Sequence, residues 1–232
     1  MKLKIPLTIF ISVFFNFSIL KSQDTRNLKL TFQPQYADSI LHLGDHYYPL
    51  NDHDSLQFET LKFYISGIVL TDNKGAVWIE NNSFHLLDAS QEQGLQCNLD
   101  IPNNFNCKSV QFQIGIDSTT NVSGALGGDL DPTKGMYWTW QSGYINFKLE
   151  GKSNLCKTRN NEFQFHIGGY LYPFSCLQTI QLDLKPTEDP VIILDIKKML
   201  ASIDLSKQNQ IMNTGLDAVK FSSLISNSFR VK

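Results

Sequence analysis

Hydrophobic and polar residues alternate in short runs along most of the chain. Residues 28–33 (LKLTFQ) alternate cleanly, with the period of two that is typical of a strand with one buried face. Similar β-branched or aromatic runs, separated by Gly, Pro, Asn and Asp, occur at residues 61–70, 76–80, 84–88, 110–116, 144–149, 163–167, 179–184 and 191–196. This many short strands between turn signals predicts an all-β fold, an antiparallel β-sandwich.

Helical spacing is confined to the C-terminal region. Residues 197–203 (KKMLASI) predict a short helix, and residues 215–227 predict a longer one that Thr214 caps. In the longer segment Leu216 and Val219 begin an apolar repeat of helical period. The apolar faces of both helices need the strands to bury them, so residues 23–232 are expected to form a single domain: a β-sandwich with a short C-terminal helical segment.

The N-terminus has the pattern of a targeting segment. Lys2 and Lys4 precede a largely apolar stretch at residues 5–20, and the composition becomes polar at Lys21. A membrane span needs about 20 apolar residues, and Asn16 interrupts this shorter stretch. Residues 1–22 are therefore expected to be a secretory signal peptide, and the protein to be periplasmic or secreted without a transmembrane anchor.

The charge and the motifs of the chain argue against two classes of function, nucleic-acid binding and catalysis. The formal net charge is −2, from 20 basic and 22 acidic residues, and no basic patch is present. A nucleic-acid partner is therefore not expected. No Ser-His-Asp ordering, nucleophile elbow or paired-carboxylate motif occurs, so the protein is expected not to be an enzyme.

Four cysteines offer either disulfides or metal ligands. An exported protein meets an oxidising compartment, where an even number of cysteines favours disulfides. Pairing Cys97 with Cys107 and Cys156 with Cys176 brackets two short segments, and we favour this connectivity over the two others. A zinc site would need closer pairs such as C-x-x-C.

An aromatic window occupies residues 136–144 (MYWTWQSGY). Tyr137 and Thr139 alternate with Met136, Trp138 and Trp140, which predicts a strand with both tryptophans on one face. The pair would either anchor the core or form a stacking surface for a ligand. Before it, Asp129 and Asp131 in a glycine-rich stretch are interpreted as turn residues, with calcium binding as the alternative.

Histidine supplies the candidate metal ligands. His166 alternates with Phe163 and Phe165, so its imidazole is predicted to lie on the opposite face of the strand from the core. His85 occupies a similar position in residues 84–88 and is a second candidate. A neutral imidazole is a common ligand for copper and zinc. His42 and His46 have an i, i+4 spacing, but Gly44 and Asp45 between them indicate a loop.

Four stretches resemble one known family. GMYWTWQSGYINFKLEG at 135–151 is accompanied, in order along the chain, by LKFYISGIVL at 61–70, GIDSTTNVSGALGGDLDP at 115–132 and FHIGG at 165–169. Together they resemble the MbnP-like copper-binding domain family of secreted or periplasmic proteins, over most of the chain from about residue 28 onward.

The resemblance implies a copper ion as the cofactor and His166 as a ligand. Relatives often carry a histidine where this chain has Met212, whose thioether could substitute as a ligand for Cu(I). In some members a tryptophan is oxidised to kynurenine, which makes Trp138 and Trp140 candidates to shape the site. Some members also sit beside a dihaem peroxidase-like protein, so such a partner is expected.

Two hypotheses follow. The first is an exported, non-catalytic copper-binding protein for storage or handling of the metal. The second is a metal-free β-sandwich, a binding or structural module that recognises a glycan or a protein partner through its aromatic residues.

Overall fold

The computed structural model describes residues 24–91, 93–185 and 189–232. The expected signal peptide, residues 1–22, lies outside these ranges. Within them, none of the helices has the length and apolar character needed to cross a bilayer.

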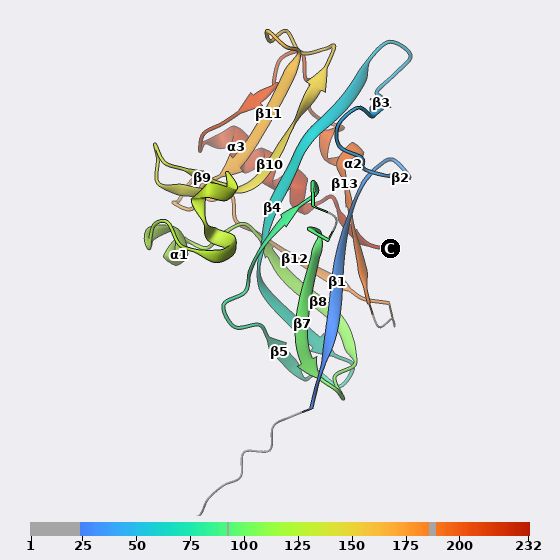
Figure 1. The fold of residues 1–232 in the computed structure, drawn as a ribbon, viewed down its shortest axis with the longest axis vertical. Coiled ribbons are helices and arrows are strands. Elements are labelled where there is room, and N and C mark those ends of the chain that lie inside the picture. The colour runs from blue at the N-terminus through green and yellow to red at the C-terminus, as the bar shows by residue number, and fades with distance from the viewer. Residues whose placement is uncertain (1–23, 92, 186–188) are drawn as a thin grey trace, which may run out of the picture.

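Two β-sheets form the body of the protein (Figure 1). The first sheet contains β15 (Phe229–Val231), β13 (Val191–Asp195), β1 (Thr25–Tyr36), β2 (Ser39–Ile40) and β7 (Gln96–Pro102). The second contains β12 (Gln178–Asp183), β8 (Cys107–Ile114), β4 (Ser55–Asp72), β10 (Gly143–Ser153), β11 (Glu162–Gly168) and β14 (Gln210–Ile211), with β3 (Tyr47–Pro49), β5 (Val77–Ile79), β6 (Phe84–Asp88) and β9 (Tyr137–Trp138) paired at its margins. The predicted all-β sandwich is confirmed.

Most neighbouring strands are antiparallel, and two pairs are parallel. β1 runs parallel to β13, and β11 runs parallel to β14. Parallel neighbours need a long connection between them, so these pairings join distant parts of the chain. The sequence pattern predicted the strands and not these two directions.

Strand β4 organises the second sheet. It is 18 residues long and crosses the molecule diagonally in Figure 1. On one side its first half pairs with β10, for example Phe63 with Phe147, and its second half pairs with β8. Short strands pair along its other side. Because paired residues share a face, β4 fixes which side chains of β10 and β11 point away from the core.

The core between the sheets is built around aromatic rings. Phe32 of β1 contacts Phe63, Phe112 and Phe229 edge to face, at ring-centroid distances of 6.1, 5.4 and 6.4 Å. All four side chains are buried. Edge-to-face contacts add to the stabilisation that burial of apolar surface gives.

The helices follow the C-terminal prediction with one correction. α3 (Leu216–Ser226) lies within one residue of the predicted bounds, whereas α2 (Ile196–Leu200) begins one residue before and ends three residues before the predicted bounds. Phe221 of α3 packs on Phe165 of β11 with ring centroids 4.7 Å apart. The predicted Thr214 cap is wrong, because Gly215 is the N-cap and no side chain caps the helix. A further helix, α1 (Ser118–Val122), was not predicted.

Candidate functional site

The outer face of β10 and β11 carries the polar residues that the core excludes. Phe147 and Leu149 of β10 point into the core, so Lys148 and Glu150 point outward. Lys148 is paired with His166 of β11, which places the imidazole on this outer face. The predicted orientation of His166 is therefore confirmed by the register of the sheet.

A carboxylate holds the His166 ring. Nε2 of His166 lies 2.6 Å from Oε1 of Glu150, and the histidine side chain is only 9% exposed. An ionised carboxylate only accepts hydrogen bonds. Nε2 of His166 therefore carries a hydrogen atom and donates a hydrogen bond to Glu150. Nδ1 is then left with the lone pair that a metal ion could bind.

The same contact perturbs the carboxyl group. The hydrogen bond from His166 is the largest cause that lowers the pKa of Glu150 from its ordinary 4.5 to about 2, while burial opposes the shift. A hydrogen bond from Thr60 and the charge of Lys148, whose Nζ lies 3.6 Å away, act in the same direction as His166. Sequence reasoning missed Glu150, because its proximity to His166 depends on strand register.

Acid should weaken this contact in a defined pH range. Because folding lowers the pKa of Glu150, its ionised form stabilises the protein above about pH 4.5, and this contribution is lost as the pH falls toward about 2. Glu150→Gln should lower the free energy of unfolding at pH 7 by about 1 kcal/mol, the low end for a hydrogen bond to a charged group, because the carboxylate is partly exposed. In urea unfolding, the difference from wild type should disappear by about pH 2 to 3; a difference that stays constant with pH would contradict the assignment.

Met212 directly follows β14, the strand that pairs with β11. In the parallel pairing of β11 with β14, Gln164 is opposite Gln210 and Phe165 is opposite Ile211. The pairing ends there, one residue before His166 in β11 and one residue before Met212. Met212 is 40% exposed. Two of the three predicted metal ligands thus lie on, or directly after, neighbouring strands.

The third predicted ligand, His85, does not join them. Its β6 neighbour two positions along, Leu87, lies in the main core, and its partner across the strands, Ile65, is also a core residue. His85 therefore belongs to the core-side face of the sheet, opposite to His166, where its Nε2 lies 2.8 Å from Glu80. We correct the prediction that His85 shares a site with His166: His85 is hydrogen-bonded to Glu80 at the sheet margin.

An insertion between β8 and β10 covers the outer face beside His166 (Figure 1). It contains α1, the 3-10 turns η1 (Gly128–Leu130) and η2 (Pro132–Lys134), and β9. Its apolar residues form a second hydrophobic cluster with Tyr64 and Tyr144. The Tyr144 hydroxyl accepts a hydrogen bond from the Leu126 amide at 3.0 Å, and it lies 3.1 Å from the Leu130 carbonyl, which ties the insertion to the sheet.

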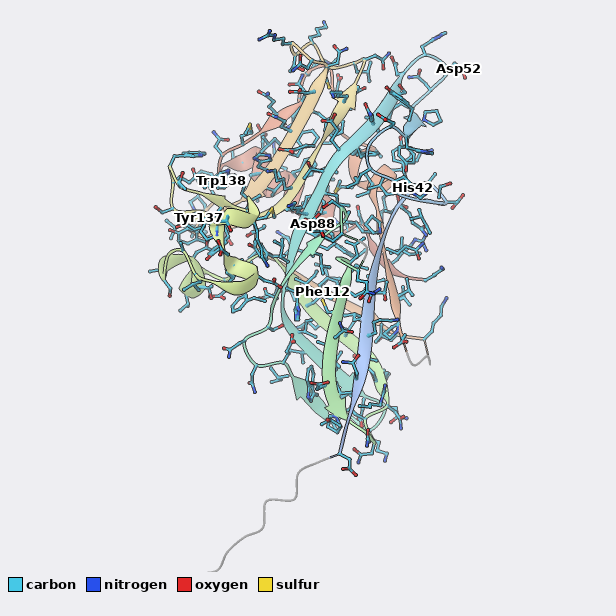
Figure 2. The ribbon with its side chains drawn as sticks, viewed as in Figure 1. His42, Asp52, Asp88, Phe112, Tyr137 and Trp138 are labelled. Atoms are coloured by element: carbon cyan, nitrogen blue, oxygen red, sulfur yellow. The ribbon has the colours of Figure 1, made fainter. Side chains whose placement is uncertain are left out.

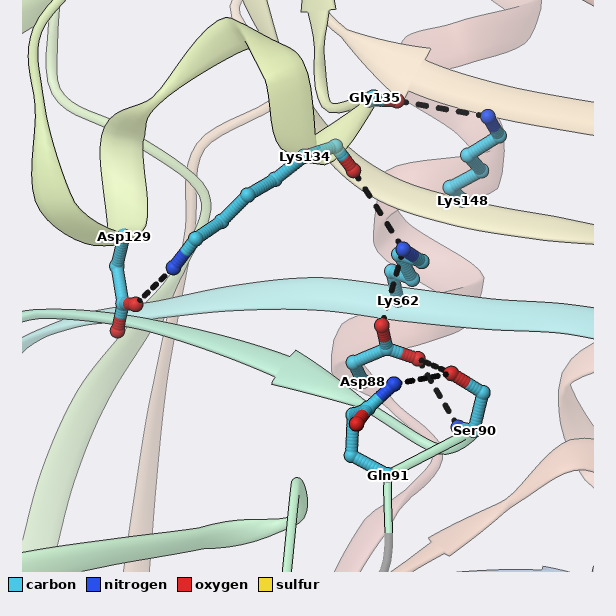
Figure 3. Close-up of polar contacts among 8 residues, drawn as sticks. All are labelled: Lys62, Asp88, Ser90, Gln91, Asp129, Lys134, Gly135 and Lys148. Atoms are coloured by element: carbon cyan, nitrogen blue, oxygen red, sulfur yellow. Dashed lines mark hydrogen bonds and ion pairs between the residues drawn. The ribbon is translucent and has the colours of Figure 1, made fainter.

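Two lysines on the outer face also hold this insertion. Lys62 donates to the Lys134 carbonyl at 3.5 Å, and Lys148 donates to the Gly135 carbonyl at 3.4 Å (Figure 3). Lys134 in turn pairs with Asp129 at 2.7 Å. The Asp131 carboxylate accepts from the Thr133 amide at 2.8 Å, which agrees with its interpretation as a turn residue. The Asp129 carboxylate instead accepts from the Leu86 amide of β6 and from Lys134, so it ties the insertion to the sheet.

Trp138, at the end of the insertion, packs directly over β11. Trp138 is 5% exposed, and a methyl group at Gly168 would come within 2.7 Å of Cζ3 of the indole. Gly168 follows His166 by two positions, so both lie on the same face. The glycine is therefore what lets the indole approach the strand next to the imidazole.

The two tryptophans are in different environments. Strand β9 ends at Trp138, and the chain then turns through Ser142, which has a φ of 49°. Trp140 is 65% exposed, although its ring centroid is only 5.8 Å from that of Trp138. The predicted strand through Trp140 is wrong, because the hairpin turn begins one residue after Trp138. One indole is buried and the other faces solvent.

A pocket of about 340 Å³ opens beside Trp138. This volume lies within the range of small-molecule sites. Five of its eleven lining residues are aromatic, and the lining comprises Trp138, Gln141, Gly143, Tyr144, Gly169, Tyr170, Leu171, Tyr172, Pro173, Phe174 and Thr214. Tyr172 is 97% exposed, and Trp140, whose ring lies 5.8 Å from that of Trp138, is 65% exposed. The site is therefore an imidazole and a thioether next to an aromatic pocket.

The four cysteines, all within the described ranges, are free thiols. The Cys156 amide donates a hydrogen bond to the Ser153 carbonyl, and Ser153 itself bonds to Asn161, just before β11. The Cys176 amide donates to the carbonyl of Gly169, just after β11. A strand of this length spans about 20 Å, whereas a disulfide needs Cα atoms about 4.4–6.8 Å apart. The predicted bridge between Cys156 and Cys176 is therefore wrong.

The other predicted bridge is wrong for a similar reason. Cys97 lies in the first sheet opposite Leu30, and Cys107 lies in the second sheet opposite Asp72. Five strand residues separate Cys97 from the end of β7, where the chain turns toward Cys107.

Burial raises the pKa of all four thiols, to about 11 for Cys107 and about 12 for Cys176. Thiolate ligation is correspondingly disfavoured.

Among the described residues, few side chains near His166 could serve as metal ligands. In the ranges that the structure describes, no three residues among His, Cys, Asp and Glu gather into a group that could hold a metal ion. Met212 offers a donor outside those four residue types, and its thioether is soft.

Comparisons with known proteins agree on one family. The sequence profile of the MbnP family matches residues 25–213. No curated protein matches the chain significantly. Among solved structures, MbnP from Methylosinus trichosporium superposes with a TM-score of 0.63 at 15% identity, covering 79% of this chain and 80% of that one. The profile match spans most of the sequence, and the chain therefore belongs to the MbnP family.

Proposed function

We propose that the protein is an exported, non-catalytic copper-binding protein whose site is the outer face of β11. Two observations support this most directly: His166 lies on the strand next to the one that Met212 follows, and the glycine beneath Trp138 is two residues from His166. Glu150 holds Nε2 of the imidazole, so Nδ1 is the proposed ligand atom.

The residues present fit copper in its reduced state. An imidazole suits copper, and a thioether favours Cu(I) over harder divalent ions. Trp138 packs over Gly168, two residues from His166, although an unmodified indole lacks a lone pair that could bind the metal. A bound copper ion would supply a soft, redox-capable centre. The role of the protein would be to bind this ion for storage or handling, without catalysing a reaction.

His166 is expected to dominate Cu(I) affinity. His166→Asn should lower it by more than about 100-fold, because even a residue that only orients a ligand contributes about 10–100-fold. The measurement is competition with a chromophoric Cu(I) chelator under reducing conditions. His85→Asn is the matched control, because His85 faces the other side of the sheet. The Cu(I) affinity of this variant should equal that of wild type. Equal affinity of the His166 variant and wild type would contradict the proposal.

The resemblance also motivates a proposed partner. If a dihaem peroxidase-like protein oxidises a tryptophan of this chain, Trp140 is the accessible one, since it is 65% exposed and Trp138 is 5% exposed. Intact-mass analysis of the exported protein would detect conversion to kynurenine, in which the side chain gains one oxygen atom and loses one carbon atom. Export itself rests on the expected signal peptide at residues 1–22.

A second function is favoured by the aromatic pocket. Its volume of about 340 Å³ and the exposed rings of Trp140 and Tyr172 suit a glycan or a protein segment that stacks on aromatic side chains. This alternative requires no metal. Absence of Cu(I) binding by wild type in the competition measurement would leave it as the preferred function.

A further inference from the structure

The segment that joins β2 to β3 carries two histidines that the proposed copper site does not use. The ring centroids of His42 and His46 are 5.6 Å apart, and the rings are tilted by 54°. Both residues are exposed. Figure 2 shows His42 on the opposite side of the molecule from Trp138, so this pair is remote from the outer face of β11.

The backbone of this segment is fixed by buried contacts. The hydroxyl of Tyr48, a buried side chain, accepts a hydrogen bond from the His42 amide at 2.6 Å. Gly44, with a φ of 84°, turns the chain between the two histidines, and its carbonyl accepts from the side chain of Gln57 at 2.8 Å. The His46 ring also packs on Tyr48, with centroids 4.5 Å apart. The two imidazoles therefore stand on a loop with a defined shape.

Their separation matches that of two imidazoles on one metal ion. A metal–nitrogen bond of about 2.0–2.1 Å puts the metal about 3.2 Å from each ring centroid. An angle of about 110–120° at a tetrahedral metal then separates the centroids by about 5.2–5.5 Å. The observed 5.6 Å differs from this range by about a tenth of an ångström. The angle of about 90° in a square-planar Cu²⁺ site gives about 4.5 Å, so Cu²⁺ requires a small rotation of the two exposed side chains.

We propose that His42 and His46 form a second metal site, for a divalent transition-metal ion of borderline softness, with Cu²⁺ the tightest. Two imidazoles suit copper, nickel and zinc, and affinity in such sites is highest for Cu²⁺. No third His, Cys, Asp or Glu of the described residues completes a group with them, so water fills the remaining positions. The site is open and exchanges its metal with solvent.

This site is independent of the proposed Cu(I) site. The outer face of β11 offers a thioether, which favours the reduced ion, whereas the His42–His46 pair offers only nitrogen, which also suits the oxidised ion. The two sites can therefore be measured separately. Cu²⁺ is paramagnetic and Cu(I) is not, so electron paramagnetic resonance detects the histidine pair without interference from the reduced ion.

The test is a titration of metal-free protein with CuCl₂, followed by electron paramagnetic resonance. Wild type should show a saturable signal with hyperfine structure from two nitrogen ligands. His42→Asn and His46→Asn should each abolish that two-nitrogen signal. His53→Asn, which changes another exposed histidine in the turn after β3, should leave it intact.

His166→Asn separates this proposal from the proposed function. That variant should retain the two-nitrogen Cu²⁺ signal even if it loses Cu(I) affinity. The second site would be overturned if His42→Asn and His46→Asn bind Cu²⁺ as wild type does, or if the signal depends equally on His53 and reflects adventitious surface binding only. Circular dichroism of each variant verifies that the fold is unchanged.

Discussion

Phe32→Ala is expected to lower the free energy of unfolding by about 3–5 kcal/mol, the range for removal of a buried phenylalanine from a close-packed core. Phe32 belongs to the first sheet, and its three ring partners include Phe63 and Phe112 of the second sheet. Its side chain is 1% exposed. Removing the ring takes away two aromatic contacts between the sheets, those with Phe63 and Phe112, and leaves a cavity that the neighbouring strands fill only in part.

Urea unfolding monitored by circular dichroism measures this effect. Phe32→Leu retains much of the buried volume and should be less than half as destabilising as the alanine variant. Val77→Ala, at a position that is 59% exposed, should change stability by no more than about 0.5 kcal/mol. A loss below 1 kcal/mol for Phe32→Ala would mean that the sheets do not depend on this ring.

Gly168→Ala is expected to cost about 3 kcal/mol, the upper part of the range for overpacking. The added methyl group would lie 2.6 Å from the Tyr144 carbonyl oxygen and 2.7 Å from the Trp138 ring. The carbonyl belongs to β10, next to the point where Ile145 pairs with Gly168, so it cannot move without disturbing that pairing. The indole must therefore be displaced from its position beside His166.

Two measurements report separately on this variant. Urea unfolding gives the loss of stability, and tryptophan fluorescence should shift to longer wavelength as Trp138 becomes exposed. If Trp138 shields the proposed copper site, Cu(I) affinity should also fall. Gly127→Ala is the matched control, because a methyl group there meets no atom within 4 Å and the φ of −98° suits alanine. A Gly168 variant with the stability and fluorescence of the Gly127 variant would refute the packing argument.

The alternation of apolar residues was sufficient to predict the main strands. Residues 84–88 were predicted as a strand and form β6 with these bounds, and residues 191–196 form β13 with one residue fewer. The signal is clear where one face is buried and the other is polar. Short strands such as β9 and β14 were missed or misjudged, since two residues have no period and exist only through their partners.

The site was predictable only in part. The alternation around His166 predicted its orientation, because that property is local to one strand. His85 has a similar alternation, yet it faces the other side of the sheet, because face assignment depends on which apolar neighbours reach the core. Glu150 is 16 residues from His166 in the sequence, and only the antiparallel register brings them together.

The disulfide prediction failed for a related reason. Short separation in sequence favoured the bridge between Cys97 and Cys107, but the chain between them crosses from one sheet to the other. Strands are extended, so few residues cover a long distance. Spacing along a β-rich chain is therefore a poor guide to distance in space.

The parallel pairing of β1 with β13 has a consequence for biosynthesis. β1 begins at Thr25 and its partner begins at Val191, so a ribosome must complete most of the polypeptide before the two can meet. Contacts between such distant segments slow folding, and unpaired strand edges promote association with other chains while they persist. The nascent chain would therefore benefit from a chaperone that shields β1 until translation is nearly finished.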